Sequence, residues 1–428
     1  MIKVLLNNKK LQIFKATMLA FFYFLQMLIN LPKMLVLSWN NMATVPTKST
    51  GSLRITTISE KLPELWQTPK DVLQGERLVN ISLCHVAARQ ADNDNKMSFL
   101  WKLYNEKTEL LERRSGASCS QVFSLDPKVI YTHKITVQLT MASSDMEDAE
   151  YYTEIIEKSS KIDKVYWLAS VGDSFSSGQG NPDIPVTRGK AAKWLDETCY
   201  RSSKSFPYQV FRKMTNKSSA LSFFACSGAT VDAGILSKNG QLDRLEKVMK
   251  LRDDPPDVLL LTIGGNDIGF TDIISMMQQG SSLEQSFDMR FFYVSHQIDR
   301  VATKIQELKI PRVILITYYD VTKNEHGVVD ASCGLFGQVS LSNLQQAEKK
   351  ILRRLNQLLI KKAKKYGWIT VDTTEMFRRN GLCSNHGSLI RSRNESLTLQ
   401  GNEYGSFHPN EEAHRKISEM VLKVLENV

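Results

Sequence analysis

The carboxyl-terminal part of the chain alternates short apolar runs with segments of helical periodicity. The apolar runs are Val165–Val171, Ala220–Ala225, Asp257–Ile263, Arg312–Tyr318 and Trp368–Val371. Short continuous apolar runs are typical of strands that are buried on both faces of a parallel sheet. Because helical segments separate these runs, the pattern predicts an α/β domain with a parallel sheet and helices on both of its faces.

A long helix is predicted between the last two runs. Apolar residues recur there every three or four positions, at Leu344, Ala347, Ile351, Leu355 and Leu358. Such spacing places them on one face of a helix. Ser342 and Gln345 have the spacing of a capping box at its start, and Gly367 stands at its end. A last helix is predicted to begin after Asn410, whose side chain can cap it.

The region from residue 48 to residue 143 has a β-like pattern. Alternating or β-branched segments occur at Val79–Cys84, Met97–Leu103 and Tyr131–Thr140. Cys84, Trp101 and Cys119 fall on or beside these segments, as in a small sandwich with a disulfide over a buried tryptophan. The last segment loosely resembles the closing strand of immunoglobulin-like or PKD-like modules. An irregular β-rich extension packed on the next domain is the alternative.

The amino-terminal segment has the features of a targeting signal. Ala16–Leu31 is mostly apolar and follows four lysines, which is typical of a signal peptide. Pro32 and Lys33 interrupt the run before it reaches the roughly 20 residues that a membrane span requires. We therefore expect a cleaved signal and a secreted or lumenal protein, with an uncleaved membrane anchor or a buried structural helix as alternatives.

These patterns divide the chain into four parts. They are a signal or anchor with its spacer at residues 1–47, a β-rich module at residues 48–143, a linker or short helix at residues 144–160, and the α/β domain at residues 161–428.

Positive charge is concentrated at the amino terminus. The 428 residues include 55 Lys and Arg against 45 Asp and Glu, a net charge of +10. Residues 1–50 hold six of the lysines and no acidic residue, so the rest of the chain is close to neutral. Its basic cluster, between Lys349 and Lys365, is interpreted as the solvated face of the long helix. We expect no nucleic-acid partner, and peripheral contact with a lipid surface stays open.

Six cysteines and three Asn-X-Ser triplets fit a secretory route. The cysteines allow 15 pairings, and none has a second Cys or a His at the spacing of a zinc site. A zinc site is therefore not expected. The triplets begin at Asn80, Asn216 and Asn394 and predict a glycoprotein.

Four segments carry residues that are suited to acyl transfer. Ser174 follows the first apolar run, Gly228 the second and Asn266 the third, and His408 precedes the last helix. The carboxyl ends of parallel strands share one edge of a sheet, where ligands bind. A serine, a histidine, a side-chain amide and an exposed backbone N–H are the components of nucleophilic ester or amide cleavage.

The four segments resemble the sequence blocks of the SGNH hydrolases, also called the GDSL esterase/lipase family. The matching residues are Gly172-Asp173-Ser174, Gly228, Gly265-Asn266-Asp267 and His408. The resemblance covers residues 161–428 and is to the secreted bacterial-type esterase branch. It implies a flavodoxin-like three-layer α/β/α fold and no metal or other cofactor. It also implies that Ser174 is the nucleophile and His408 the base, and that Ser174, Gly228 and Asn266 form the oxyanion hole.

One position departs from the family pattern. The family usually has an aspartate three residues before the histidine, and this chain has Gly405 there. Because some members of the branch use a backbone carbonyl instead, the resemblance implies that the carbonyl of Gly405 orients His408. Glu403 is the alternative. Asp173 and Asp267 are expected to hold their loops by hydrogen bonds.

The resemblance also implies a set of disulfides. Cys199–Cys226 would brace the loop that carries Gly228, and Cys333–Cys383 would tie the segment after the fourth strand to the region before His408. Cys84–Cys119 is then left for the β-rich module. Buried free thiols are the alternative.

The expected activity is serine-dependent hydrolysis of carboxylic esters through an acyl-enzyme on Ser174, as in an esterase or lipase. The substrate is expected to be a lipid or an acylated glycan, and the protein a monomer. Glycan O-deacetylation is a second hypothesis for the activity. A binding or adhesion protein with a relic hydrolase domain is a third. Specificity is expected to come from two loops, Asn181–Thr198 and Phe270–Phe291.

Overall fold

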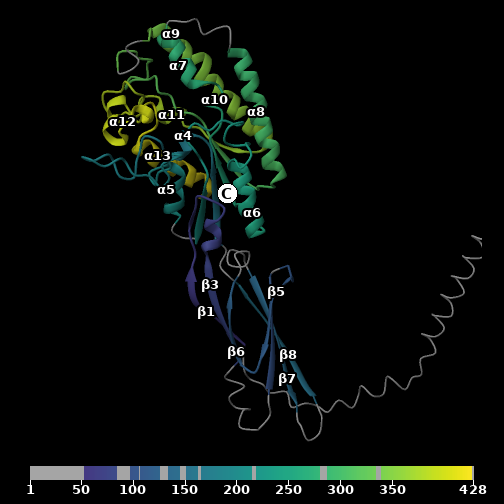
Figure 1. Cartoon of the computed structure of the whole chain (residues 1–428). Helices are drawn as coiled ribbons and strands as arrows, with labels where there is room; N and C mark the ends of the chain where they lie inside the picture. Colours follow the sequence, from purple (N-terminus) through teal and green to yellow (C-terminus); the bar gives the residue numbers. More distant parts are fainter. Residues whose placement is uncertain are drawn as a thin grey trace, which may run out of the picture. The chain divides into compact units, whose positions relative to one another are not determined.

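The five apolar runs form neighbouring strands of one parallel sheet, as predicted (Figure 1). In chain order they are β9 (Tyr166–Val171), β10 (Ser219–Phe223), β11 (Val258–Leu261), β12 (Val313–Ile316) and β13 (Ile369–Val371). Their order across the sheet is β13-β12-β11-β9-β10, which is the flavodoxin-like arrangement. The chain reverses its direction of winding between β9 and β11, and this is the point where such sheets bind ligands.

The computed structural model describes residues 53–83, 97–105, 107–125, 134–144, 151–161, 165–214, 218–279, 287–333 and 339–426. The predicted targeting segment and the triplet at Asn216 lie outside these residues. Within the described ranges, no helix is both long enough and apolar enough to cross a membrane.

Helices cover both faces of the parallel sheet. Figure 1 shows α5, α11, α12 and α13 on one side and α6, α8 and α10 on the other. The bounds of the helices are α4 (Ser174–Ser177), α5 (Phe206–Lys213), α6 (Gln241–Arg252), α7 (Phe270–Gln278), α8 (Phe287–Glu307), α9 (Leu341–Ala347), α10 (Arg353–Tyr366), α11 (Thr374–Phe377), α12 (Arg393–Gln400) and α13 (Glu411–Glu426), with short 3-10 turns at Asp71–Gln74 and Glu403–Gly405.

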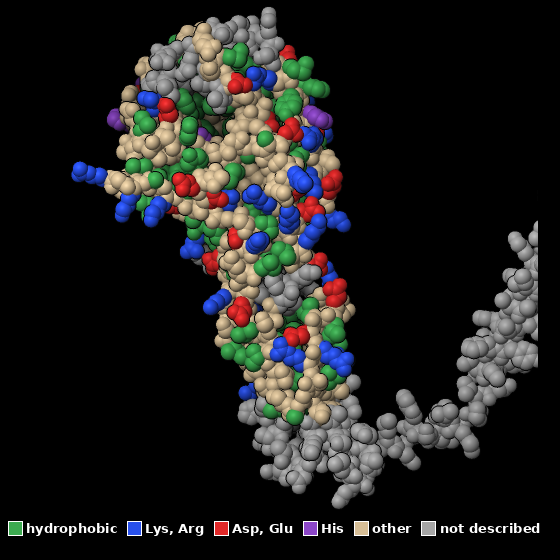
Figure 2. Space-filling model, viewed as in Figure 1, with side chains coloured by type: hydrophobic (Ala, Val, Ile, Leu, Met, Phe, Trp, Pro, Cys, Tyr) green, Lys and Arg blue, Asp and Glu red, His purple; other side chains and the backbone are tan. Residues whose placement is uncertain are grey.

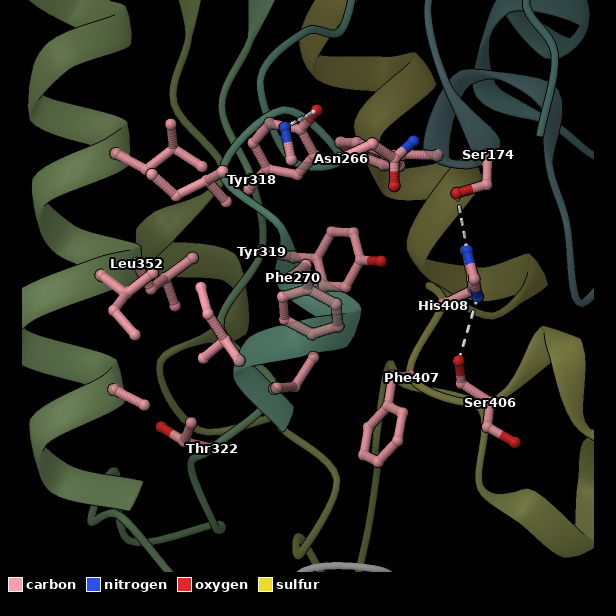
Figure 3. Close-up of a pocket in the computed structure, with 18 of the residues that line it drawn as sticks. Ser174, Asn266, Phe270, Tyr318, Tyr319, Thr322, Leu352, Ser406, Phe407 and His408 are labelled. Carbon is pink, nitrogen blue, oxygen red and sulfur yellow. Dashed lines mark hydrogen bonds between the residues drawn. The ribbon is translucent and has the colours of Figure 1, made fainter. Parts of the chain in front are cut away.

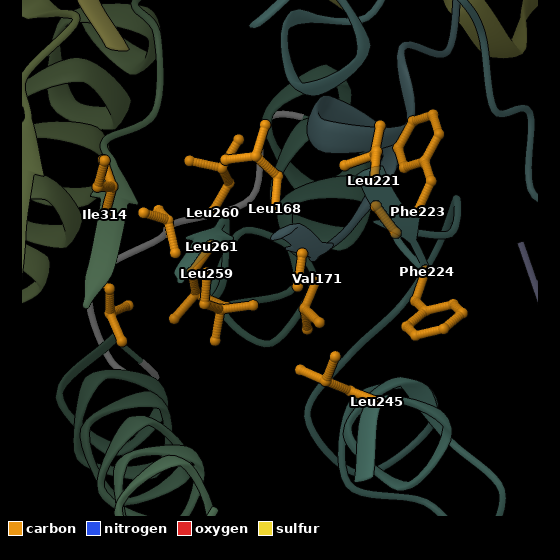
Figure 4. Close-up of a cluster of buried hydrophobic side chains, with 14 of the residues drawn as sticks. Leu168, Val171, Leu221, Phe223, Phe224, Leu245, Leu259, Leu260, Leu261 and Ile314 are labelled. Atoms are coloured by element: carbon orange, nitrogen blue, oxygen red, sulfur yellow. The ribbon is translucent and has the colours of Figure 1, made fainter. Parts of the chain in front are cut away.

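The core follows from the two-residue period of the strands. Leu260 points to one face of the sheet, whereas Leu259 and Leu261 point to the other, where Leu245 of α6 packs (Figure 4). All four side chains are fully buried. The three-layer architecture therefore rests on strands that are apolar on both faces, as their continuous runs predicted.

A sixth strand was not predicted. β2 (Leu65–Trp66) pairs in parallel with β10 at the edge of the sheet, although the sequence placed these residues in the β-rich module. Trp66 is fully buried there. Its ring lies 5.6 Å from that of Trp167 and 5.3 Å from the guanidinium of Arg252. The first described residues thus belong in part to the α/β domain.

The rest of the amino-terminal region forms two antiparallel sheets. One has the order β1-β3-β6 and the other β5-β4-β7-β8. Their bounds are β1 (Arg54–Lys61), β3 (Glu76–Ser82), β4 (Met97–Tyr104), β5 (Leu110–Gly116), β6 (Ser120–Ser124), β7 (Lys134–Ser144) and β8 (Tyr151–Lys161). Trp101 is fully buried, as expected.

The predicted linker at residues 144–160 is wrong, because β8 pairs with β7 along its whole length. The acidic residues at 147–150 suggested a linker, but the aromatic and β-branched residues that follow favour a strand.

The long helix begins and ends close to its predicted limits. Ser340, not Ser342, is its N-cap, and its side chain accepts from the N–H of Asn343 at 3.1 Å. A π-helical turn at Glu348–Leu352 joins α9 to α10, and Gly367 ends the helix with φ 70°.

The basic face of this helix is only partly solvated, because several of its cations form ion pairs. Lys362 is buried and lies 2.7 Å from Asp299. Arg354 lies 2.7 Å from Asp288.

Candidate active site

Residues from distant parts of the chain meet at the carboxyl edge of the parallel sheet. Figure 3 shows Ser174, Asn266 and His408 around one cavity. Ser174 begins α4 directly after β9, Asn266 follows β11, and His408 lies just before α13. Gly228 follows β10, in a loop held to the serine loop by the bond from Cys226 N–H to the carbonyl of Gly172 at 3.0 Å. The structure thus brings all four predicted segments together.

Ser174 and His408 form a hydrogen-bonded pair. Oγ of Ser174 lies 2.8 Å from Nε2 of His408, which is within the reach of direct proton transfer. Nδ1 of His408 lies 3.0 Å from the carbonyl oxygen of Ser406. That carbonyl can only accept, so Nδ1 carries the proton and Nε2 is left to accept the serine proton.

The orienting carbonyl is that of Ser406, which corrects the expectation of Gly405. The Gly405 carbonyl instead accepts the backbone N–H of His408 at 3.3 Å, and Phe407 has the positive φ of 65° that this turn needs. The carbonyl of Gly405 is therefore used within the turn, and the carbonyl of Ser406 faces the imidazole ring of His408. Glu403, the alternative partner, pairs with Arg393 at 2.6 Å.

The surroundings of His408 favour its neutral form. Burial of the imidazole lowers its pKa to about 4, and the hydrogen bonds to the nearby carbonyls oppose this only in part. The ring is therefore neutral at physiological pH, as a general base must be. His414, on α13, is fully buried, and its Nδ1 accepts the N–H of Phe206 at 3.2 Å. It is a packing residue, as the sequence suggested.

The asparagine amide is fixed by the neighbouring loop. Nδ2 of Asn266 donates one hydrogen bond to the carbonyl of Ala229 at 2.9 Å, which leaves its second N–H to point elsewhere. Gly228 has φ 74°, and an added Cβ would meet nothing within 4 Å. Glycine is needed there for its backbone conformation, which few other residues adopt. The amide is thus hydrogen-bonded to the residue that directly follows this glycine.

The serine loop packs tightly against the asparagine loop. A Cβ at Gly172 would lie 2.2 Å from Oγ1 of Thr262 and 2.9 Å from its carbonyl, so only glycine fits. The side-chain amide of Gln241, on α6, accepts the backbone N–H of Gly172 and donates to the carbonyl of the same glycine, each at 2.8 Å. Asp267 accepts the N–H of Val231 at 2.9 Å, and burial raises its pKa to about 6.

Tyr318 connects these two loops and was missed by the sequence reasoning. Its hydroxyl donates to Oδ2 of Asp173 and accepts the N–H of Gly265 at 2.8 Å. Asp173 is itself the N-cap of α4, with Oδ1 accepting the N–H of Phe175 at 3.1 Å. Burial raises the pKa of this carboxyl group. The signal was available, because Tyr318 ends the fourth apolar run at the same edge of the sheet.

Two predicted disulfides are present. Cys199–Cys226 has a Cα–Cα distance of 4.3 Å, and the N–H of Ser227 donates to the carbonyl of Cys199 at 3.1 Å, so the bridge braces the loop of Gly228. Cys333–Cys383 is also formed. The predicted pair Cys84–Cys119 includes Cys84, which lies outside the described residues.

An apolar cavity of about 430 Å³ opens beside Ser174 and His408. In Figure 3, Phe270, Tyr319 and Phe407 stand between the Ser174–His408 pair and the long helix, from which Leu352 points inward. The other apolar lining residues are Phe175, Ile268, Ile273, Tyr318, Val321, Leu344, Ala347, Ile351, Leu355 and Tyr404. A mostly apolar cavity with a few polar groups at one end is typical of a site for an elongated apolar ligand.

The predicted specificity segments contribute unequally to this cavity. Phe270 and Ile273 come from the segment Phe270–Phe291, whereas no lining residue comes from Asn181–Thr198. The long helix supplies a wall that was not foreseen. Among the described residues, no group of three or more His, Cys, Asp and Glu side chains could hold a metal ion.

Comparison with known proteins points to one family. The model of the GDSL-like Lipase/Acylhydrolase family matches residues 170–416. A lipase of Streptomyces rimosus is 26% identical over 254 residues, which are 56% of this chain and 79% of that protein.

Solved structures that are similar to part of this chain include the extracellular lipase of Streptomyces rimosus, with 24% identity, a TM-score of 0.43 and coverage of 61% of this chain and 99% of that chain. Another is a protein of Slackia heliotrinireducens described as an SGNH hydrolase, with 10% identity, a TM-score of 0.34 and coverage of 61% of this chain and 100% of that chain.

Proposed function

The chain belongs to the GDSL-like lipase/acylhydrolase family, and we propose that it hydrolyses carboxylic esters of lipid acyl chains through an acyl-enzyme on Ser174. The observation that carries this proposal is the Ser174–His408 pair, 2.8 Å apart, at one end of an apolar cavity.

In the proposed first half-reaction, Oγ of Ser174 attacks the ester carbonyl carbon while its proton passes to Nε2 of His408. The carbonyl oxygen becomes negatively charged. The N–H groups of Ser174 and Gly228 and the second N–H of Asn266 stabilise it, and each such donor is typically worth 10²–10³ in turnover. The carbon–oxygen bond to the alcohol then breaks, and His408 returns the proton to the departing alkoxide.

In the second half-reaction, a water molecule replaces the alcohol. His408 takes a proton from this water, the hydroxide attacks the acyl-serine carbonyl, and the same donors hold the new oxyanion. When the intermediate collapses, the carboxylic acid leaves, and the proton on His408 returns to Oγ of Ser174. No metal or cofactor is part of the proposal, because the serine, the imidazole and the oxyanion donors supply every proton and charge.

The apolar cavity supports an acyl chain as the bound group. Its lining is aliphatic and aromatic apart from the catalytic groups and a few polar residues of the long helix and neighbouring loops. Each buried methylene of a ligand is worth about 0.8 kcal/mol, so such a cavity favours a long chain over acetyl. Removal of acetyl groups from glycans would leave most of this cavity unfilled.

We further propose that the protein acts in the secretory pathway or outside the cell. The disulfides Cys199–Cys226 and Cys333–Cys383 persist in oxidising compartments. The apolar run behind four lysines at the amino terminus supplies the expected export signal.

The test is to replace the nucleophile and measure both labelling and turnover. Ser174→Ala should abolish labelling by a fluorophosphonate probe and lower the rate on p-nitrophenyl decanoate by about 10⁴-fold or more. Ser115→Ala, at an exposed position of β5, is the control and should behave as the unchanged chain.

Full activity of the Ser174 variant would contradict the mechanism. A folded wild-type chain that neither labels nor hydrolyses any ester in a panel of lipids, phospholipids and acetylated glycans would support a relic domain instead.

A further inference from the structure

Large apolar side chains are exposed at the start of α8. Met289 is 71% exposed and Phe292 is 73% exposed. The inner face of the same helix is buried through Phe287, Phe291 and Val294, so this helix is apolar on both sides over its first two turns. An isolated exposed apolar residue is ordinary, but adjacent ones on one helix face indicate a contact surface.

This part of α8 lies at the active-site edge of the sheet. α8 connects β11 to β12, which are parallel, so the helix begins at their carboxyl edge. The guanidinium of Arg290 donates to the carbonyl of Ile268 at 2.9 Å. Ile268 and Phe270 both line the cavity, and Phe270 is 39% exposed. The start of α8 is therefore joined to the segment that forms one wall of the cavity.

Two other exposed apolar residues belong to the cavity lining or lie next to it in the chain. Tyr404 lines the cavity and is two-thirds exposed. Leu341 is exposed at the first position of α9, one turn before the lining residue Leu344. We call Phe270, Met289, Phe292, Leu341 and Tyr404 the apolar rim. Figure 2 shows hydrophobic side chains gathered around a hollow at this end of the hydrolase domain.

The carboxylates beside the rim are neutralised by arginines. Asp288 lies 2.7 Å from Arg354. Asp272 lies 3.6 Å from Arg290. A third carboxylate, Asp232, accepts from the hydroxyl of Tyr293 at 2.7 Å and pairs with a guanidinium of α8. These carboxylates are therefore paired, and the rim residues themselves are uncharged, which matches an uncharged or zwitterionic surface.

We propose that the apolar rim docks the enzyme onto the surface of uncharged or zwitterionic lipid aggregates, with the cavity mouth facing the lipid. This inference rests on the proposed function and names the physical state of its substrate. An acyl chain that leaves an aggregate must otherwise cross water before it reaches the cavity. Contact between the rim and the lipid removes that step and buries the exposed side chains of α8.

The test measures docking separately from catalysis. In the Ser174→Ala background of the full chain, Met289→Ser together with Phe292→Ser should weaken flotation with phosphatidylcholine vesicles and triacylglycerol emulsions by about 10- to 100-fold. Binding of the parent should be insensitive to salt. Ile58→Ser together with Val122→Ser, at exposed apolar positions of β1 and β6, is the matched control and should bind as the parent does.

A second measurement uses the catalytically intact chain. The rim variant should lose activity on emulsified esters by a similar factor and retain its kcat/KM on dissolved p-nitrophenyl butyrate. Unchanged flotation of the rim variant would overturn the docking proposal, as would salt-sensitive binding that requires anionic lipid. Loss of a dimer in size-exclusion chromatography with unchanged flotation would assign the rim to contact between copies of this chain. Absence of all esterase activity in the wild type would refute the proposed function and leave the flotation result standing.

Discussion

At the scale of single residues, the notable feature is a histidine oriented by a neutral carbonyl. A carboxylate partner would stabilise the imidazolium that forms when the serine loses its proton. The Ser406 carbonyl, 3.0 Å from Nδ1, fixes the tautomer and the direction of the ring but supplies no full charge. Burial then dominates and keeps the pKa of His408 at about 4.

This low pKa predicts an unusually broad acid range for activity. Protonation of His408 removes the general base, so kcat/KM should stay level from neutral pH downward and fall with an apparent pKa of about 4. With an ordinary histidine, kcat/KM would already fall at about pH 6.5. The measurement is a pH–rate profile on a soluble ester with an uncharged leaving group. A fall near pH 6.5 in a chain that is still folded would contradict the assignment.

Stability must be measured over the same pH range, because the buried histidines also affect folding. The pKa values of His408 and His414 are lowered to about 4 and about 3, below the unfolded value of about 6.5. The unfolded chain therefore binds more protons below pH 6.5. The stabilising contribution is full above that pH and is lost as the pH falls from there toward 3. Circular dichroism at each pH separates this loss from protonation of the base.

The catalytic candidates could be found from the sequence because Ser174, Gly228 and Asn266 each follow a strand closely and His408 directly precedes the last helix. Their partners could not. Whether Gly405 or Ser406 faces the imidazole depends on the positive φ of Phe407, which no residue type at that position reveals. Tyr318 meets Asp173 across 145 residues of chain, and neither residue predicts the other.

At the scale of elements, the long helix shows how a periodic pattern can be interpreted only in part. The spacing of its apolar residues predicted one buried face correctly. Four of these residues, Leu344, Ala347, Ile351 and Leu355, line the cavity. A face that packs against the core and a face that lines a ligand cavity have the same periodicity, so the sequence alone could not distinguish them.

A larger side chain on this wall should change the preferred acyl length. Ala347→Phe places a ring where the helix faces the cavity. It should lower kcat/KM for p-nitrophenyl laurate by about 10-fold or more, since a filled pocket rejects the longer chain. The value for p-nitrophenyl butyrate should stay nearly unchanged, because the short chain remains beside Ser174.

Gln345→Phe, at an exposed position of the same helix, is the control for that substitution and should preserve both rates. Equal losses on the two esters in the Ala347 variant would indicate a general disturbance of the helix. The cavity would then not be the site of the acyl chain.

At the scale of the whole molecule, the predicted boundary at residue 161 leaves out a strand of the parallel sheet. β2 has only two residues, which is too short to show a period, and its partner β10 begins more than 150 residues later. Pattern analysis detects long elements with a clear repeat and misses an edge strand that is defined only by its tertiary pairing. The β-rich region and the hydrolase domain are therefore joined through the sheet as well as along the chain.

Trp66 provides the test of this connection. Its ring is fully buried against Trp167 and Arg252, so Trp66→Ala should leave a cavity beside a buried guanidinium. The expected loss is about 3–5 kcal/mol of unfolding free energy, seen as a fall in Tm of about 10 °C. Trp194→Ala, which removes an indole that is only half-buried and lies outside the sheet, should cost less. If the Trp66 variant unfolds at the wild-type temperature, β2 is not part of the hydrolase core, and the domain begins after β8 as the sequence suggested.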